Sequence, residues 1–289
     1  MLSQDITNRL ATQFGTKFEI SSFQSLGGGS INQAARIESK QGDFFIKWNS
    51  AAKFPEMFQK ESDSLKILAK TDTIRIPKVI MANEEGEESF LFLEYIEQGN
   101  KSSNFWQDFA YALAQLHRNT QSQYGLTFDN YIGSLPQSNQ MYAQWNDFFV
   151  EERLHPQIKM ARDSSLLDKS IILQFEKLFN RLDSIFPVEK PALLHGDLWS
   201  GNFMVDKHGN ACIFDPAIYF GNRIMDIGMT QMFGGFAPEF YQLYNEAFPM
   251  ENNWKEQLDI ANLYPNLVHL NLFGYSYLSG IKVALSRFS

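Results

Sequence analysis

The most informative stretch of the chain is LLHGDLWSGNFMVDKHGNACIFDP, residues 193–216. It contains His-Gly-Asp, with Asn202 five positions after Asp197, and a later aspartate, Asp215, next to an apolar run. Short apolar runs flank the His-Gly-Asp turn, so Asp197 and Asn202 are predicted on one loop between strands, and Asp215 at the end of the next strand. Asp and Asn often do no more than cap a turn, but this spacing rarely arises by chance.

Phosphoryl transfer needs three oxygen-bearing side chains of this kind. An aspartate orients the attacking hydroxyl and accepts its proton, while amide and carboxylate oxygens hold magnesium against the phosphates. Asp197 is therefore the predicted catalytic base, and Asn202 and Asp215 are the predicted metal ligands. His195 opens the loop and is expected to pack and hydrogen-bond locally rather than to move protons.

A glycine-rich turn and a lysine lie upstream of this stretch. Glycines let backbone N–H groups approach phosphate oxygens closely, and Lys47, in an apolar strand, would supply a positive charge. The turn departs from G-x-G-x-x-G and could be an ordinary hairpin, and Lys47 could be a surface lysine. Their order ahead of His-Gly-Asp favours ATP binding. The residues predicted to bind the nucleotide are Gly28, Gly29, Ser30, Ile31, Asn32, Lys47, Glu61, Glu94 and Ile96.

Glu61 lies on a predicted helix, where its carboxylate could fix Lys47 or remain a solvated charge. Glu94 and Ile96 end a predicted strand, where backbone groups would meet an adenine edge. Two further residues have two interpretations each. Asp226 could accept N–H groups of the catalytic loop or cap a helix, and Trp199 could be a platform for the substrate or part of the core.

The chain changes from strand-rich to helix-rich near residue 98. Strands are predicted at 19–25, 33–39, 42–48, 76–81 and 90–96, and helices at 55–70, 106–118, 142–160 and 166–185. We therefore expect an α+β, bilobal protein-kinase-like fold. Residues 1–97 would form a nucleotide-binding lobe with an antiparallel sheet and one interrupting helix, and residues 98–289 a mostly helical catalytic and substrate lobe.

Composition limits the partners. The formal net charge of −8 disfavours nucleic acid, because a phosphate backbone would be repelled. Cys212 is the sole cysteine and is expected to be a buried apolar residue, which fits a reducing, cytoplasmic location. The start of the chain is predicted to be an amphipathic surface helix with Ile6 and Leu10 on its apolar side. The apolar segment 263–280 contains too many polar residues for a membrane span and is predicted to be one buried helix.

Several segments resemble the fructosamine kinase (ketosamine 3-kinase) family. They are HGDLWSGN at 195–202, IFDPAIYFGNRIMDIGM at 213–229 and FGGFAPEFYQLYNEAFP at 233–249. GGGSINQA at 27–34 and LYPNLVHLNLFG at 263–274 are similar to that family as well, in the same order, so the resemblance covers nearly the whole chain. Kinases of choline or aminoglycosides share His-Gly-Asp but lack the Leu-Trp-Ser-Gly and Phe-Gly-Gly-Phe segments.

The resemblance implies transfer of the ATP γ-phosphate to the 3-hydroxyl of a ketosamine, followed by breakdown of the product and release of the amine. By position, Asp197 matches the family's base, Asn202 and Asp215 its metal ligands, and Lys47 with Glu61 its phosphate-binding ion pair. Ser30 stands where some members carry a cysteine, so redox control there is not expected. Another hydroxyl acceptor, or a non-catalytic nucleotide-binding protein, remains an alternative. The preferred sugar, the amine partner and the oligomeric state are not predicted.

Overall fold

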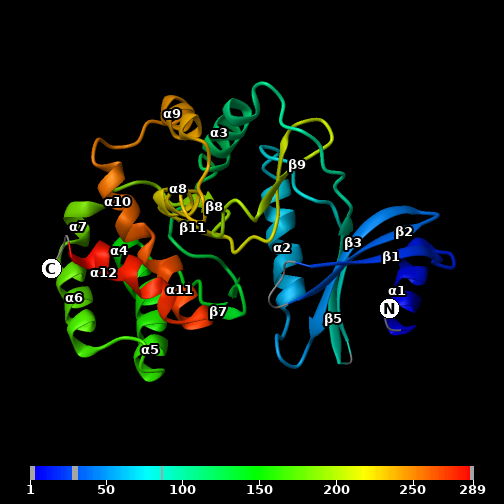
Figure 1. Ribbon diagram of the computed structural model, residues 1–289, viewed down its shortest axis with the longest axis horizontal. Helices are drawn as coiled ribbons and strands as arrows, with labels where there is room; N and C mark the ends of the chain where they lie inside the picture. The colour runs from blue at the N-terminus through cyan, green and yellow to red at the C-terminus, as the bar shows by residue number, and fades with distance from the viewer. Residues whose placement is uncertain (1–3, 28–31, 86, 287–289) are drawn as a thin grey trace. The chain divides into compact units, whose positions relative to one another are not determined.

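The computed structural model describes residues 4–27, 32–85 and 87–286 (Figure 1). The chain divides into two compact units. The first consists of Met1–Ser103 and Met204–Phe214, and the second of Asn104–Phe203 and Asp215–Ser289. The assignment of nucleotide binding to residues 1–97 and of catalysis to residues 98–289 stays a prediction.

An antiparallel sheet with a helix on each face forms the first unit. The strands, in spatial order, are β1 (Ile20–Leu26), β2 (Gln33–Ser39), β3 (Gly42–Ser50), β5 (Glu88–Glu94) and β4 (Val79–Glu85). Along β5, side chains alternate between the two faces, as the twofold period of a strand requires. Phe90 and Phe92 pack with Ile6 of α1 (Gln4–Phe14), whereas Leu91 and Leu93 pack with Phe58 of α2 (Met57–Ala69). Figure 1 shows α1 and α2 on opposite sides of this sheet.

All five predicted strands are present, but two have clearly shifted bounds. The strand predicted at 90–96 is β5, which begins at Glu88 and ends at Glu94. The strand predicted at residues 76–81 is β4, which begins only at Val79 and continues to Glu85. Pro77 explains the late start, because proline has no N–H to donate to the ladder. Pairing of Glu85 with Glu88 then leaves only two residues between β4 and β5.

A two-stranded hairpin, β9 (Phe203–Val205) and β10 (Ala211–Ile213), joins the predicted metal ligands Asn202 and Asp215 along the chain. From Met204 to Phe214 this hairpin belongs to the first unit. Asp206 in its turn is 2% exposed and binds Arg75, with 2.7 Å between Oδ2 and Nη1. The Arg75 carbonyl oxygen accepts from the Ile213 N–H at 3.0 Å, so both ends of the hairpin are held.

The second unit is mostly helical. Its strands form two pairs, β6 (Asn130–Ile132) with β7 (Leu135–Gln137) and β8 (Ala192–Leu194) with β11 (Tyr219–Gly221). Its helical segments are α3 (Phe105–Leu116), α4 (Trp145–Phe148), the π-helical turn η1 (Phe149–Leu154), α5 (His155–Asp163), α6 (Lys169–Phe179), α7 (Leu182–Ile185), α8 (Ile224–Met229), α9 (Pro238–Ala247), α10 (Trp254–Ala261), α11 (Leu263–Phe273), the 3-10 turn η2 (Tyr275–Tyr277) and α12 (Leu278–Ser286).

Two long predicted helices are interrupted. The helix expected at 142–160 begins only at Trp145 and passes through the π-helical turn η1 before α5. In η1 the Arg153 side chain is fully buried, and its guanidinium lies 4.0 Å from the centre of the Tyr219 ring. The helix expected at 166–185 is two helices, α6 and α7, and α6 begins where Asp168 accepts the Ile171 N–H at 3.0 Å.

The apolar segment near the end of the chain is also divided. The single helix predicted for residues 263–280 is wrong, because α11 ends at Phe273 and Gly274 takes a positive φ of 87°. An L side chain is strained at that angle, whereas glycine is not. Within the described ranges, every helix is too short or too polar to span a lipid bilayer.

The contacts of Asp206 in the β9–β10 hairpin can be tested by measuring the stability of a variant. Burial would raise the pKa of Asp206, but hydrogen bonds from the Asn210 N–H and from Arg75 outweigh it and lower that pKa. Asp206→Ala should therefore destabilise the protein at pH 7 by about 1–3 kcal/mol, because partly buried donors, Arg75 among them, lose their acceptor. A lowered carboxyl pKa contributes its full stability above the unfolded pKa and loses it as the pH falls through the folded pKa, so the difference from wild type should shrink as the pH falls below about 4.

Thermal or urea unfolding at several pH values measures this difference. Lys207→Ala, at an exposed neighbouring position, is the matched control and should stay within about 0.5 kcal/mol of wild type. A loss of stability that is equally large at pH 3 and pH 7 would show that the Asp206 charge is not its cause.

Candidate active site

The loop between β8 and β9 brings the predicted base and one predicted metal ligand together. The Asn202 Nδ2 atom donates to Asp197 twice, to the carbonyl oxygen at 2.8 Å and to carboxylate Oδ2 at 2.9 Å. The buried side chain of Leu198 holds the middle of the loop in the core. Because the Asn202 amide nitrogen faces Asp197, its amide oxygen is directed elsewhere and can act as a ligand.

Gly196 explains how the loop lies against the segment that carries Asp215. The Ala217 N–H donates to the His195 carbonyl oxygen at 2.9 Å, so the two segments run close together. A Cβ atom at Gly196 would overlap the Ala217 carbonyl oxygen, and the φ of 81° there also suits only glycine. Asp215 itself has a φ of 56°, a strained angle for a non-glycine residue of the kind that clusters at functional sites.

The Asp226 carboxylate fixes the start of the predicted catalytic loop, residues 195–202. It lies in α8, is 1% exposed, and accepts from the His195 N–H at 2.7 Å and from the Gly196 N–H at 2.9 Å. The His117 ring contributes a third contact at 3.2 Å. Of the two interpretations from the sequence, contact with the loop backbone is the one observed, because the N-cap of α8 is Arg223. Burial would raise the pKa of Asp226, but His117 and the loop amide outweigh it and lower that pKa.

His195 and Asp197 have different surroundings. His195 is fully buried, and its Nδ1 accepts from the Asp197 N–H at 3.3 Å, a local contact of the kind expected from the sequence. Burial of the Asp197 carboxyl raises its pKa to about 7, against the hydrogen bond from Asn202, and the negative charges of Asp215 and Asp226 add to the rise. A carboxyl with such a pKa can take up and release a proton near neutral pH.

The oxygen donors fit magnesium better than a transition metal. In the described part of the chain, no three His, Cys, Asp or Glu side chains gather to form a metal site by themselves. Asn202 and Asp215 offer hard oxygen atoms, and Asp215 is exposed at its loop. Magnesium commonly takes one or two protein carboxylates and completes its shell with substrate phosphates and water, so two protein ligands are sufficient.

Lys47 and Glu61, both predicted to serve the nucleotide, form an ion pair within the first unit. Lys47 Nζ lies 2.5 Å from Glu61 Oε1, and both side chains are largely buried. Asn32 is also in this unit, where its Oδ1 accepts from Asn49 at 2.9 Å. Gly28, Gly29, Ser30 and Ile31 lie outside the described residues.

Glu94 is the last residue of β5, whereas Ile96 lies two residues beyond it, so the strand predicted at 90–96 extends too far. The Glu94 carboxylate accepts from the Lys78 N–H at 3.0 Å, so this side chain is bound to the protein's own backbone. Ile96 is buried. Any contact of these residues with adenine would be made by backbone groups, and it stays a prediction.

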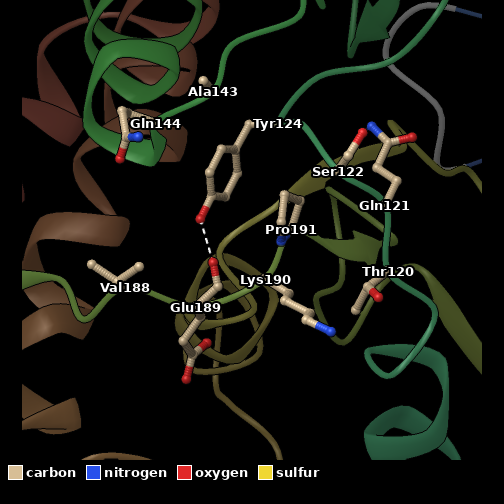
Figure 2. A pocket seen from close by; sticks show the side chains of 10 residues that line it. All are labelled: Thr120, Gln121, Ser122, Tyr124, Ala143, Gln144, Val188, Glu189, Lys190 and Pro191. Atoms are coloured by element: carbon tan, nitrogen blue, oxygen red, sulfur yellow. Dashed lines mark hydrogen bonds between the residues drawn. The ribbon is translucent and has the colours of Figure 1, made fainter.

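A separate hollow of about 480 Å³ lies in the second unit and contains none of the predicted site residues (Figure 2). Tyr124 and Glu189 lie on its wall, joined by a hydrogen bond of 2.6 Å from the Tyr124 hydroxyl to the Glu189 carbonyl. The Glu189 carboxylate is bound to Arg223 at 2.8 Å.

Sequence reasoning assigned no role to His117 or Phe233. His117 Nδ1 shares a hydrogen bond of 2.7 Å with the Tyr244 hydroxyl, which orients its ring toward Asp226. Phe233 packs edge-on against Trp199 at 5.2 Å between ring centres. Both contacts join residues more than 30 positions apart, so no local spacing could indicate them, although Phe233 lies in a segment that resembles a known family.

The raised pKa of Asp197 can be tested by protein stability, without any substrate. An acid whose folded pKa exceeds its unfolded value destabilises the protein increasingly as the pH rises between the two values. Asp197→Asn should therefore raise the melting temperature at pH 8, by at least about 2 °C, and the gain should vanish near pH 4.

The measurement is a thermal unfolding series without nucleotide or magnesium. Asp147→Asn removes the same charge from an exposed position and should show no such pH-dependent gain. A variant at Asp197 that is less stable than wild type at pH 8 would contradict the raised pKa of the Asp197 carboxyl.

Comparison with known proteins agrees with this geometry. The family model described as fructosamine kinase matches residues 2–288. A relative from Enterococcus faecium, named as a probable ketoamine kinase, is 40% identical over 90% of this chain and 93% of its own. A chloroplastic protein-ribulosamine 3-kinase of Arabidopsis thaliana is 35% identical over 96% of this chain and 86% of its own.

A solved structure has the same fold throughout. A crystal structure from Haemophilus somnus, whose name places it with the fructosamine-3-kinases, superposes with a TM-score of 0.88 at 31% identity, covering 98% of this chain and 96% of that one. The expected protein-kinase-like fold is thereby confirmed. The catalytic loop, the sequence match over nearly the whole chain and the shared architecture lead to one conclusion: this chain belongs to the fructosamine kinase family.

Proposed function

We propose that this protein uses ATP and magnesium to phosphorylate the 3-hydroxyl of ketosamines, the sugar adducts of amines. The main support is that Asp197, Asn202 and Asp215 lie in two adjoining segments that Gly196 allows to run together, in a chain of the fructosamine kinase family. A protein-ribulosamine 3-kinase is among the relatives, which favours a ketosamine over an aminoglycoside or choline-like acceptor.

Asp197 acts as the base in this proposal. Its carboxylate accepts the proton of the 3-hydroxyl as the hydroxyl oxygen bonds to the γ-phosphorus and the bond from that phosphorus to ADP breaks. The pKa of about 7 makes the group a competent proton acceptor at neutral pH. Asn202 restrains the carboxylate through the 2.9 Å hydrogen bond, so one oxygen is held while the other can face the substrate.

The charges of ATP require partners as well. The Asn202 amide oxygen and the Asp215 carboxylate would hold magnesium, which neutralises the phosphates and the charge that develops during transfer. Lys47 would bind phosphate oxygens, and Glu61 keeps its ammonium group in place through their 2.5 Å contact. The 3-phosphate product is expected to break down and free the amine, so the proposed role is deglycation.

Cys212 bears on the proposed cytoplasmic location. Its thiol is buried in β10, and burial raises its pKa to about 12, so it stays protonated and unreactive. A cysteine of this kind is compatible with a reducing compartment, although a relative from Arabidopsis thaliana is chloroplastic.

Asp197→Asn tests the function directly. The variant should lose about 10²–10⁴-fold in kcat for ADP formation with ribulosamine or fructosamine, because the amide cannot accept the proton. Nucleotide affinity should change little, since the ligands of the phosphates are retained. ADP release and binding of a fluorescent ATP analogue measure the two quantities.

Asp147→Asn again serves as the matched charge control and should retain wild-type kcat. Two outcomes would overturn the proposal: wild-type protein that forms no ADP above background with either ketosamine, or full activity in Asp197→Asn.

A further inference from the structure

A row of aromatic rings continues outward from the catalytic loop. The aromatic row consists of Trp199, Phe233, His269, Phe273 and Tyr277. From Trp199 to Phe233, on to His269 and on to Tyr277, the ring centres are separated by 5.2, 4.9 and 4.9 Å. All five residues belong to the second unit.

Parts of the row are exposed although they are strongly apolar. Phe233 is 39% exposed and Phe273 is 51% exposed, whereas Trp199 is half-buried. Exposed aromatic groups that gather in one place on a protein surface usually mark a binding site. The row begins at Trp199, between Asp197 and Asn202, so it is continuous with the proposed site of phosphoryl transfer.

The backbone is shaped to present Phe233. This residue has a φ of 54°, and Gly234 and Gly235 follow with positive φ values of 98° and 71°. Its carbonyl oxygen accepts from the Ser200 hydroxyl at 3.3 Å, which connects it to the catalytic loop. A bulky side chain is costly in left-handed backbone, and such strain persists where the surrounding structure fixes it.

The row is also uncharged. His269 Nδ1 donates to the Pro265 carbonyl oxygen at 2.7 Å, and burial lowers the pKa of this ring. At neutral pH it is therefore a neutral aromatic surface. Ring faces carry partial negative charge and attract an alkylammonium group.

The covalent structure of a ketosamine indicates which part of the molecule would fit the aromatic row. Its nitrogen is separated from C3 by only two carbons, and as an alkylamine it carries a positive charge at neutral pH. On the other side of C3 the sugar has only two or three further carbons, all bearing hydroxyl groups. The row from Trp199 to Tyr277 has three ring-to-ring distances of about 5 Å, so it is longer than these two or three carbons. The group attached to nitrogen, in contrast, can be long enough to extend along the row.

We propose that the aromatic row is the subsite for the amine-bearing arm of the ketosamine, and that it selects amines with apolar or aromatic substituents. This inference rests on the proposed function. Trp199 and Phe233 would contact the ammonium group, and Phe273 and Tyr277 would contact the substituent beyond it.

The test compares fructosamines of benzylamine and of methylamine, which share one sugar and differ only in the amine. Wild-type protein should prefer the benzylamine adduct by about 10-fold in kcat/KM, mainly through KM, because its ring adds aromatic contacts with the row. Phe233→Asn should reduce this preference to less than about 2-fold. Asparagine tolerates left-handed backbone, so the ring is removed without added strain.

Three further variants sharpen the comparison. Phe233→Tyr retains a ring and should retain the preference. Tyr111→Ala removes a ring that is also 39% exposed but lies on α3, outside the row, and should leave the preference unchanged. Phe273→Ala, at the end of α11, should weaken the preference and replaces Phe233→Asn if that variant unfolds.

The outcomes separate this inference from the proposed function. ADP formation with neither adduct contradicts the function itself. ADP formation with both adducts at equal kcat/KM, or a preference that survives Phe233→Asn and Phe273→Ala, overturns the subsite while the function stands. A third outcome would also overturn the subsite: Phe233→Asn changes the ratio of kcat/KM between fructosamine and ribulosamine of the same amine but leaves the amine preference intact. The aromatic row would then contact the sugar.

Discussion

The hydrogen bonds from the His195 and Gly196 N–H groups to the buried Asp226 carboxylate are the constraint on which the catalytic loop depends. A carboxylate that is 1% exposed has lost its hydration, which is costly unless donors replace water. Two backbone amides and the His117 ring supply such donors, and each bond to a charged group contributes about 1.5–3 kcal/mol. The hydrogen bonds that stabilise the buried Asp226 charge are therefore the same hydrogen bonds that fix the loop.

This anchoring determines the properties of Asp197. With the loop held, Asp197 stays beside Asn202 and close to the charges of Asp215 and Asp226, in a partly buried place that raises its pKa to about 7. A solvent-exposed aspartate would remain ionised and would be a weak base. The protein thus keeps a carboxyl in an environment that costs stability, as is common where a side chain is adapted to chemistry.

Much of the fold and part of the site could be predicted from the sequence. The residues of β2 and β3 and the spacing of His195, Asp197 and Asn202 are local patterns, and the predictions made from them agree with the positions observed. The contact of His117 with Asp226 spans more than 100 positions and leaves no local pattern. The break of segment 263–280 at Gly274 depends on a backbone angle that hydrophobic periodicity does not report.

Amide hydrogen exchange of His195 and Gly196 tests the central claim most directly. If Asp226 anchors the catalytic loop, both amides should exchange as slowly as core amides in wild type and should lose that protection in Asp226→Asn, while amides of the distant helix α6 keep theirs. Protection of both amides that is unchanged in Asp226→Asn would contradict the account, because the loop would then be held by other interactions.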